Sequence, residues 1–224
     1  MSTFENTTYI LTELLRQIST GAIQLPEFQR GWTWDDDQIK DLLVSVAGRY
    51  PIGSVTLLEY ADKNLLKPRP VEGLGKSVPK GCEPEMLILD GQQRLTSLVR
   101  SVFIDSPVDT FTASRKSIKR YYYIDIEKAV TDTIEAAVFS VDERRELRDN
   151  AAKKVKLKLH CAEQEFRTKC FPCHLIMQSD DWETGFLKIN PGAVKLLDEF
   201  REKVLEPFRT FPVPVTLLKR DTPA

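Results

Sequence analysis

The sequence has no hydrophobic run long enough to cross a membrane. A transmembrane helix needs about 20 consecutive apolar residues, and polar or charged residues interrupt every apolar stretch of this 224-residue chain well before that length. No signal-peptide core follows Met1 either. These absences predict a cytoplasmic protein without a membrane partner.

Cysteine is scarce, and net charge is almost absent. Four cysteines in a chain of this length do not resemble the disulfide framework of a small secreted domain. The 32 Lys and Arg residues are balanced by 33 Asp and Glu residues, so the formal net charge is -1. This balance excludes a polybasic protein that attracts nucleic acid over its whole surface. Contact with a nucleotide or with DNA therefore has to come from a local site.

The chain contains helices and strands in an interspersed order, without internal repeats. Apolar spacing and turn residues predict helices at about 9–19, 35–47, 95–103, 142–152 and 192–208. They predict strands at 22–25, 54–58, 86–89, 121–126, 136–140, 153–159 and 213–218. Regular βαβ spacing is missing, so we expect an α+β domain with a mixed sheet flanked by helices.

One stretch does not fit this pattern of short elements. Residues 62–84 are rich in Lys, Pro and Gly and show little apolar periodicity. A structureless loop of this length is uncommon in a folded domain and is usually functional or disordered. We therefore interpret residues 62–84 as a functional or mobile loop.

The most informative segment is a strand, a turn and a helix with the sequence Asp90-Gly91-Gln92-Gln93-Arg94 at the turn. A helix N-terminus attracts anions, Gly91 lets a ligand approach the backbone, and Arg94 offers a planar fork for a phosphate. Asp90 is suited to hold Mg²⁺ or orient a water, and the two glutamine amides can do likewise. Asp90 followed by Gln93 also resembles a capping box, which needs no ligand. Spacing alone supports both interpretations equally, and the segment is not a P-loop.

A second segment combines aromatic residues with an arginine. Residues 24–34 contain Phe28, Arg30, Trp32 and Trp34 around Pro26 and Gly31. Aromatic rings beside an arginine suit base stacking and phosphate pairing. The alternative is that the rings pack into the core beside the next helix and that Arg30 pairs with one of the carboxylates at 35–37. The pattern alone favours this second alternative.

Three of the cysteines are candidate ligands of a metal ion. Cys170, Cys173 and His174 have C-x-x-C-H spacing, and Cys161 lies nine residues before Cys170. Four such ligands can hold a tetrahedral zinc ion. The apolar neighbours of Cys170 and Cys173 favour buried, unliganded thiols instead. Zinc is therefore not the preferred interpretation.

Three motifs together carry a resemblance to a known family. LPEFQRGWTWDDDQIKDLL, YPIGSV and LILDGQQRLTSL resemble the N-terminal domains of GmrSD-type restriction endonucleases, whose signature is the DGQQR stretch. That family is similar in fold to the ParB and sulfiredoxin domains. The clear match covers residues 11–103.

The resemblance implies a nucleoside-triphosphate-hydrolysing domain of an anti-phage restriction system. It implies that GTP or ATP binds with Mg²⁺ and that the target is modified phage DNA. The catalytic residues implied are Asp90, Gln92, Gln93 and Arg94, with Asp90 also near Mg²⁺. Nucleotide contacts are expected from Gln29, Arg30, Gly91 and Arg94.

The chain also departs from the family in two ways. Members usually continue past the last strand into a helix with an N-T-G-G stretch, and many carry an HNH nuclease domain. This sequence ends at Ala224 and contains only two histidines, His160 and His174. We expect residues 1–224 to form one domain that is truncated at its C-terminus, with the nuclease in another domain or subunit and a homo-oligomer as a further option.

A non-enzymatic function is the alternative. In it, Phe28, Trp32 and Trp34 read modified DNA and the chain recruits a separate nuclease. Direct DNA cleavage by this chain is the least favoured option, because the sequence has no cluster of metal-binding histidines.

Overall fold

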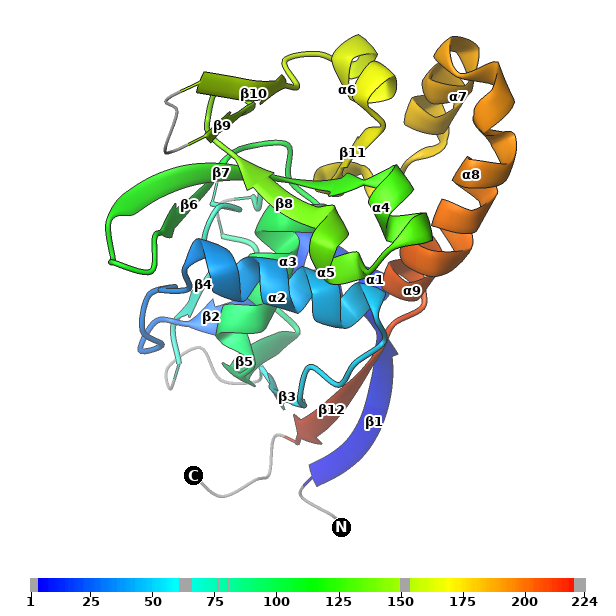
Figure 1. Ribbon diagram of the computed structural model, residues 1–224. Coiled ribbons are helices and arrows are strands. Elements are labelled where there is room, and N and C mark those ends of the chain that lie inside the picture. Colours follow the sequence, from blue (N-terminus) through cyan, green and yellow to red (C-terminus); the bar gives the residue numbers. More distant parts are fainter. Residues whose placement is uncertain (1–3, 61–65, 76, 80, 150–153, 220–224) are drawn as a thin grey trace. The chain divides into compact units, whose positions relative to one another are not determined.

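Helices and strands are interspersed in the computed structural model, which describes residues 4–60, 66–75, 77–79, 81–149 and 154–219 (Figure 1). The chain divides into two compact units. Unit 1 consists of Met1–Thr33, Pro51–Val99 and Thr210–Ala224, and unit 2 consists of Trp34–Tyr50 and Arg100–Arg209. The α+β class is confirmed, and the ParB and sulfiredoxin likeness stays a prediction. The single domain expected from the sequence also stays a prediction.

Unit 1 is built on a mixed six-stranded sheet with the order β1-β12-β3-β5-β2-β4. Its elements are β1 (Phe4–Ile10), α1 (Leu11–Thr20), β2 (Ile23–Pro26), β3 (Val55–Glu59), β4 (Pro68–Arg69), β5 (Met86–Asp90), the start of α3 (Gln92–Val102) and β12 (Pro212–Leu218). β12 runs parallel to β3 and antiparallel to β1, while β5 runs parallel to β2 and antiparallel to β3. The mixed sheet is therefore as predicted.

The core of unit 1 comes from apolar stripes at helical spacing. Leu11, Leu14, Leu15 and Ile18 of α1 are buried, as are Leu95, Leu98 and Val99 of α3. Gly21 ends α1 with a φ of +86°, and its N–H donates to the carbonyl of Ile18. The sequence pattern predicted both helices because each stripe follows from local spacing alone.

Part of the predicted long loop is anchored on unit 1. Pro68–Arg69 forms β4 against β2, and Val71, Leu74 and Val78 are buried. The rest of the predicted range 62–84 includes residues 62–65, 76 and 80, which lie outside the described residues.

Unit 2 contains a four-stranded sheet in which β7 pairs with each of the other three strands. β7 pairs antiparallel with β6, β8 and β11. The strands of this unit are β6 (Val108–Phe111), β7 (Ser117–Asp125), β8 (Val138–Val141), β9 (Glu146–Asp149), β10 (Lys154–Lys158) and β11 (Cys170–Pro172). The helices are α2 (Asp36–Ala47), α4 (Ile126–Thr131), α5 (Ile134–Ala137), α6 (Ala162–Thr168), α7 (Asp180–Ile189), α8 (Val194–Phe200) and α9 (Glu206–Arg209).

The helix predicted at 142–152 is wrong over its described part. Asp142 to Arg145 forms a turn in which Arg145 N–H donates to the Asp142 carbonyl, and Arg145 adopts a φ of +56°. The chain then continues as β9, which pairs with β10. Charged residues favour helices by propensity, but this segment has no apolar stripe, so pairing with β10 decides its structure.

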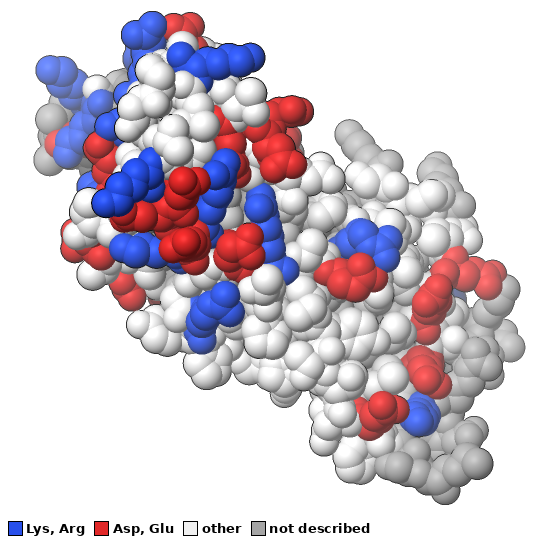
Figure 2. All heavy atoms as spheres, turned by 90° about the vertical axis from the view of Figure 1, so that its right-hand side faces the viewer, with Lys and Arg blue, Asp and Glu red and all other residues white. Residues whose placement is uncertain are grey.

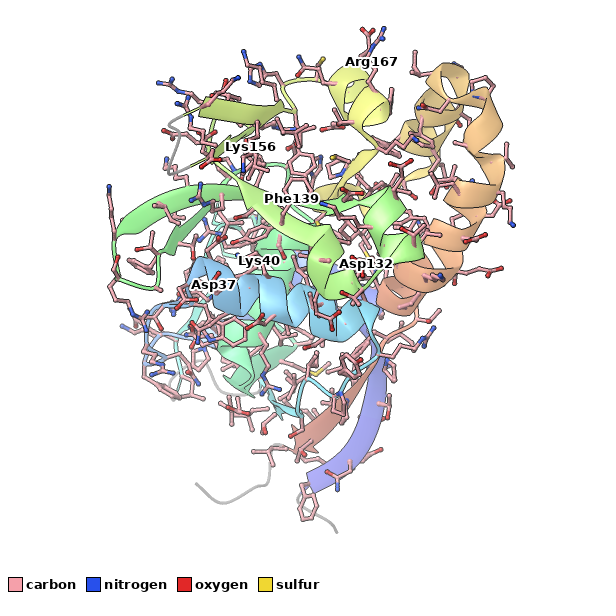
Figure 3. The ribbon with its side chains drawn as sticks, in the orientation of Figure 1. Asp37, Lys40, Asp132, Phe139, Lys156 and Arg167 are labelled. Atoms are coloured by element: carbon pink, nitrogen blue, oxygen red, sulfur yellow. The ribbon has the colours of Figure 1, made fainter. Side chains whose placement is uncertain are left out.

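The predicted strand at 153–159 is confirmed as β10 over residues 154–158. Lys154, Lys156 and Lys158 are exposed, while Val155 and Leu157 are half-buried. Lys156, labelled in Figure 3, pairs with Asp149 of β9 at 2.9 Å. The charge of Lys156 is therefore neutralised by a carboxylate of the same hairpin.

The last predicted helix is broken into pieces. A 3₁₀ turn at Pro191–Ala193, α8, a π-helical turn at Arg201–Leu205 and α9 follow one another. Pro207 has no N–H to continue the helical ladder, which gives a reason for the irregular turn before α9. Val194, the first residue of α8, is 50% exposed.

Charges on the surface are mixed. On the face in Figure 2, Lys and Arg side chains lie beside Asp and Glu side chains. In unit 2, Arg167 pairs with Glu163 at 2.7 Å and Arg201 pairs with Asp198 at 2.6 Å. None of the helices in the described ranges combines the length and the apolar composition that crossing a membrane takes.

A buried carboxylate, that of Glu165 on α6, links three elements of unit 2. Tyr123 Oη donates to its Oε1 at 3.1 Å, and Trp182 Nε1 donates to its Oε2 at 2.9 Å. The Arg145 guanidinium lies 3.6 Å from Oε1. Burial nevertheless outweighs these favourable contacts and raises the pKa of Glu165 above its ordinary value.

The raised pKa predicts a pH dependence of stability. In the unfolded chain Glu165 titrates near its ordinary pKa of 4.5. Between that pH and the raised folded pKa, the folded protein therefore holds a proton that the unfolded chain has lost. Its contribution to the free energy of unfolding should be complete below this pH and fall as the pH rises through the folded pKa. Urea unfolding of wild type and Glu165→Gln across this range measures the difference. A wild-type advantage that grows with pH would contradict the prediction.

Candidate functional site

The DGQQR segment forms a tight turn in unit 1, where β5 ends at Asp90 and α3 begins at Gln92. Gly91 between them has a φ of +91°, a conformation that favours glycine. A Cβ on Gly91 would lie 2.9 Å from Cγ2 of Val55 on β3. The turn and its packing therefore require glycine at this position, independently of any ligand.

The two glutamines of the motif bind the backbone of the facing loop, which we define as residues 27–33. Gln92 Nε2 donates to the Arg30 carbonyl at 2.6 Å. Gln93 Nε2 donates to the Gly31 carbonyl at 3.2 Å, and its Oε1 accepts from Thr33 N–H at 2.9 Å. The Gln93 side chain thus binds the facing loop. Its described contacts do not form the capping box with Asp90 that the sequence suggested.

The facing loop returns two contacts to the strand and helix. Gln29 Nε2 donates to the carbonyl of Leu89 on β5 at 2.7 Å. Trp32 Nε1 donates to Ser97 Oγ on α3 at 2.9 Å. The two sequence motifs thus meet in one structure, in which side chains of each bind the other.

Arg94 holds a third segment, the loop before β3. Its guanidinium donates to the carbonyls of Ile52 and Ser54, the latter at 2.8 Å. Gly53 between them has a φ of +83°, and a Cβ there would lie 2.5 Å from Arg94 Nη1. The positive φ favours glycine at this position of the YPIGSV motif. No local sequence pattern indicates that Arg94 binds carbonyls, although Gly53, two residues after Pro51, is a turn signal.

Asp90 is the exposed acid of the turn. Its side chain is 71% exposed, and Oδ2 lies 3.4 Å from Arg94 Nη2, whereas the Arg94 side chain is only 20% exposed. Arg30 is also exposed, and its position is fixed through its backbone by Gln92. The site therefore presents the Asp90 carboxylate and the Arg30 guanidinium on a backbone held by amides.

The aromatic residues have different environments. Phe28 is 67% exposed, so the interpretation that it packs into the core is wrong. Trp32 is half-buried, with its indole N–H bonded as described above. Trp34 belongs to unit 2, where it is half-buried and its carbonyl accepts from Thr110 Oγ1 at 2.8 Å.

The carboxylates expected to pair with Arg30 have other contacts in unit 2. Asp35 caps α2 by accepting from Gln38 N–H at 2.9 Å, and Gln38 Oε1 accepts in return from Asp35 N–H at 3.0 Å. Asp37 and Asp36 lie 2.8 Å and 3.6 Å from Nζ of Lys40 (Figure 3). Asp35 therefore caps α2, while Asp36 and Asp37 form ion pairs within it.

The cysteine segment is mostly buried in unit 2. Cys170 and Cys173 are buried and Cys161 is exposed. Burial raises the pKa of Cys170 to about 11, which keeps this thiol protonated at neutral pH. His174 Nε2 lies 3.6 Å from Asp105. Within the part of the chain that the structure describes, no group of three or more His, Cys, Asp or Glu residues is arranged to hold a metal ion.

The hydrogen bonds of the Gln93 side chain predict a local change in the facing loop when that side chain is removed. In Gln93→Ala, Thr33 N–H loses its acceptor and the facing loop loses two bonds, so amide exchange in residues 28–33 should accelerate. Hydrogen exchange followed by mass spectrometry measures this, with Gln178→Ala, an exposed glutamine of unit 2, as the control. Unchanged protection of the loop in Gln93→Ala would show that these bonds do not hold it.

Comparison with known proteins gives a relative and a family. The chain is 32% identical over 135 residues to the uncharacterized protein MJ0686 of Methanocaldococcus jannaschii. The match covers 58% of this chain and 22% of that protein, so the chain corresponds to a small part of its relative's length. The family described as "GmrSD restriction endonuclease, N-terminal domain" matches residues 11–205, a range that contains the whole DGQQR turn, the facing loop and the loop held by Arg94. The chain belongs to the GmrSD restriction endonuclease N-terminal domain family.

Proposed function

We propose that the chain binds and hydrolyses a nucleoside triphosphate, GTP or ATP, within a DNA restriction system. The observation that carries the proposal is the exposed Asp90 carboxylate at the start of α3, beside Arg94 Nη2. The first helical bond of α3 runs from Leu95 N–H to the Gly91 carbonyl, so the preceding N–H groups have no partner within the helix. Such N–H groups and the helix dipole favour a phosphate.

Asp90 suits Mg²⁺ that arrives with the nucleotide. Mg²⁺ is commonly bound by one or two carboxylates together with substrate phosphates and water, rather than by a cage of protein ligands. One exposed carboxylate fits that mode. Bound Mg²⁺ would neutralise phosphate charge, while the Asp90 carboxylate would orient the metal or the attacking water.

Arg30 and Arg94 would both neutralise the negative charge of the phosphates. Arg30 is exposed and would reach the phosphates from the facing loop. Two of the five N–H donors of Arg94 bind the carbonyls of Ile52 and Ser54, so a phosphate on Arg94 would be coupled to the loop at Ile52–Ser54. Gln92 and Gln93 would act as positioning residues, because their amides hold the loop that carries Arg30.

Nucleotide turnover by Asp90→Asn tests the proposal. Asp90 is exposed, so the substitution should leave the fold intact while removing the charge. We expect phosphate release from GTP or ATP with Mg²⁺ to fall about 100-fold or more, as for loss of a key electrostatic group. Asp181→Asn, an exposed aspartate of unit 2, should keep the wild-type rate. Equal rates in all three proteins, or no turnover at all, would refute hydrolysis at Asp90.

Phe28 supports a second candidate function, recognition of modified DNA with recruitment of a nuclease domain of the HNH type. An exposed ring on a loop held by amides is suited to stack on a base. In this case Phe28→Ala should weaken binding to modified phage DNA by about 1–3 kcal/mol. Fluorescence anisotropy with and without GTP or ATP measures the effect. Binding that Phe28→Ala leaves unchanged would rule out this role for the ring.

A further inference from the structure

The two edges of the sheet in unit 1 differ in their protection. At one edge β4 has two residues, Pro68 and Arg69, and such short, charged, proline-containing strands resist pairing with another chain. At the other edge β1 has seven residues, with the sequence FENTTYI, and contains no proline, lysine or arginine. No described strand pairs with the outer side of β1.

The β1 edge is also regular. Each residue from Phe4 to Ile10 pairs in unbroken register with β12, from Leu218 to Pro212. Figure 1 shows β1 in blue beside β12. Natural sheets usually interrupt an exposed edge with a bulge, a proline or a charge. β1 has none of these features apart from the charge of Glu5. Its outer side can therefore pair with one more strand.

Two large apolar residues lie on one face of this strand. Phe4 is 51% exposed and Ile10 is 45% exposed. Alternate residues of a strand share a face, so Phe4, Asn6, Thr8 and Ile10 lie together. Phe4 and Ile10 are symmetric about Thr7, the middle residue of the strand.

This symmetry makes the strand complementary to itself. When a second copy of β1 pairs antiparallel about Thr7, Phe4 lies opposite Ile10 of the other copy and Asn6 lies opposite Thr8. Both apolar pairs are then covered, and directly opposed side chains in such a pair are close enough to interact. A two-fold axis passes through the midpoint of an antiparallel pair, so a closed dimer requires no other contact.

The charges of the strand permit this pairing. Glu5 is the only charged residue of β1, and it already pairs with Lys219 at 3.4 Å. In the register centred on Thr7, Glu5 lies opposite Tyr9 of the other copy. No like charges therefore meet directly across the new strand pair.

We propose that two copies of this chain associate through antiparallel pairing of β1 with β1, centred on Thr7. The occupant of the edge is thus a second copy, and the sheet continues through both. The region that matches the family begins at residue 11, so β1 lies outside it. The dimer contact is therefore carried by a segment of this chain that the family match does not include.

Cysteine cross-linking tests the register. In a background with Cys161→Ser, which removes the exposed thiol, Thr7→Cys should give a disulfide-linked dimer under mild oxidation, because residue 7 lies opposite itself. Thr8→Cys should cross-link far less, because residue 8 lies opposite residue 6 and only diagonally from its own copy. Equal cross-linking of the two variants, or none, would overturn the register.

Sedimentation velocity tests association without any cross-link. The wild-type chain should sediment with twice the mass of one chain, and Phe4→Glu should shift it to the monomer. The double variant Phe4→Glu with Ile10→Lys places opposite charges across the predicted pair and should restore the dimer, which a misfolded strand would not do. A monomeric wild type, or a double variant that stays monomeric while Phe4→Glu is folded, would overturn the proposal.

Discussion

The side chains at the start of α3 donate hydrogen bonds to backbone carbonyls of two separate loops, and the arrangement of the candidate site depends on these bonds. Gln92 and Gln93 hold the facing loop, and Arg94 holds the loop at Ile52–Ser54. Leaving a buried donor or acceptor without its partner costs about 1–3 kcal/mol. The motif therefore ties both loops to the start of α3.

This arrangement separates the residues that build the site from those that are exposed in it. Gly91 and Gln92 are buried and Gln93 is half-buried, while Asp90 and Arg30 reach the surface. A polar motif is commonly interpreted as a set of residues that touch the substrate. In this chain most of the motif instead binds the backbone, and such preorganised backbone is what electrostatic catalysis needs.

Local patterns predicted the parts of the fold that local physics decides. The helices α1 and α3 and the strand β10 each follow from spacing within one segment, and residues 24–34 and 90–94 indicated the candidate site. The helix predicted at 142–152 was wrong because the segment has no apolar stripe, and pairing of β9 with the next strand, β10, overrides helix propensity. The burial of Glu165 and the carbonyl contacts of Arg94 join segments far apart in sequence, so no local pattern contains them. The strand β1 was missed because FENTTYI is mostly polar and both of its faces are largely exposed.

The position of β12 has a consequence for the order in which the chain can fold during synthesis. β12 comes from residues 212–218, yet it lies between β1 and β3, which come from the first sixty residues. Until these late residues leave the ribosome, β1 has no neighbour to join it to the sheet. The sheet of unit 1 is therefore completed only after residues 212–218 have emerged, whereas β6, β7 and β8 of unit 2 are adjacent in sequence and can pair as they emerge.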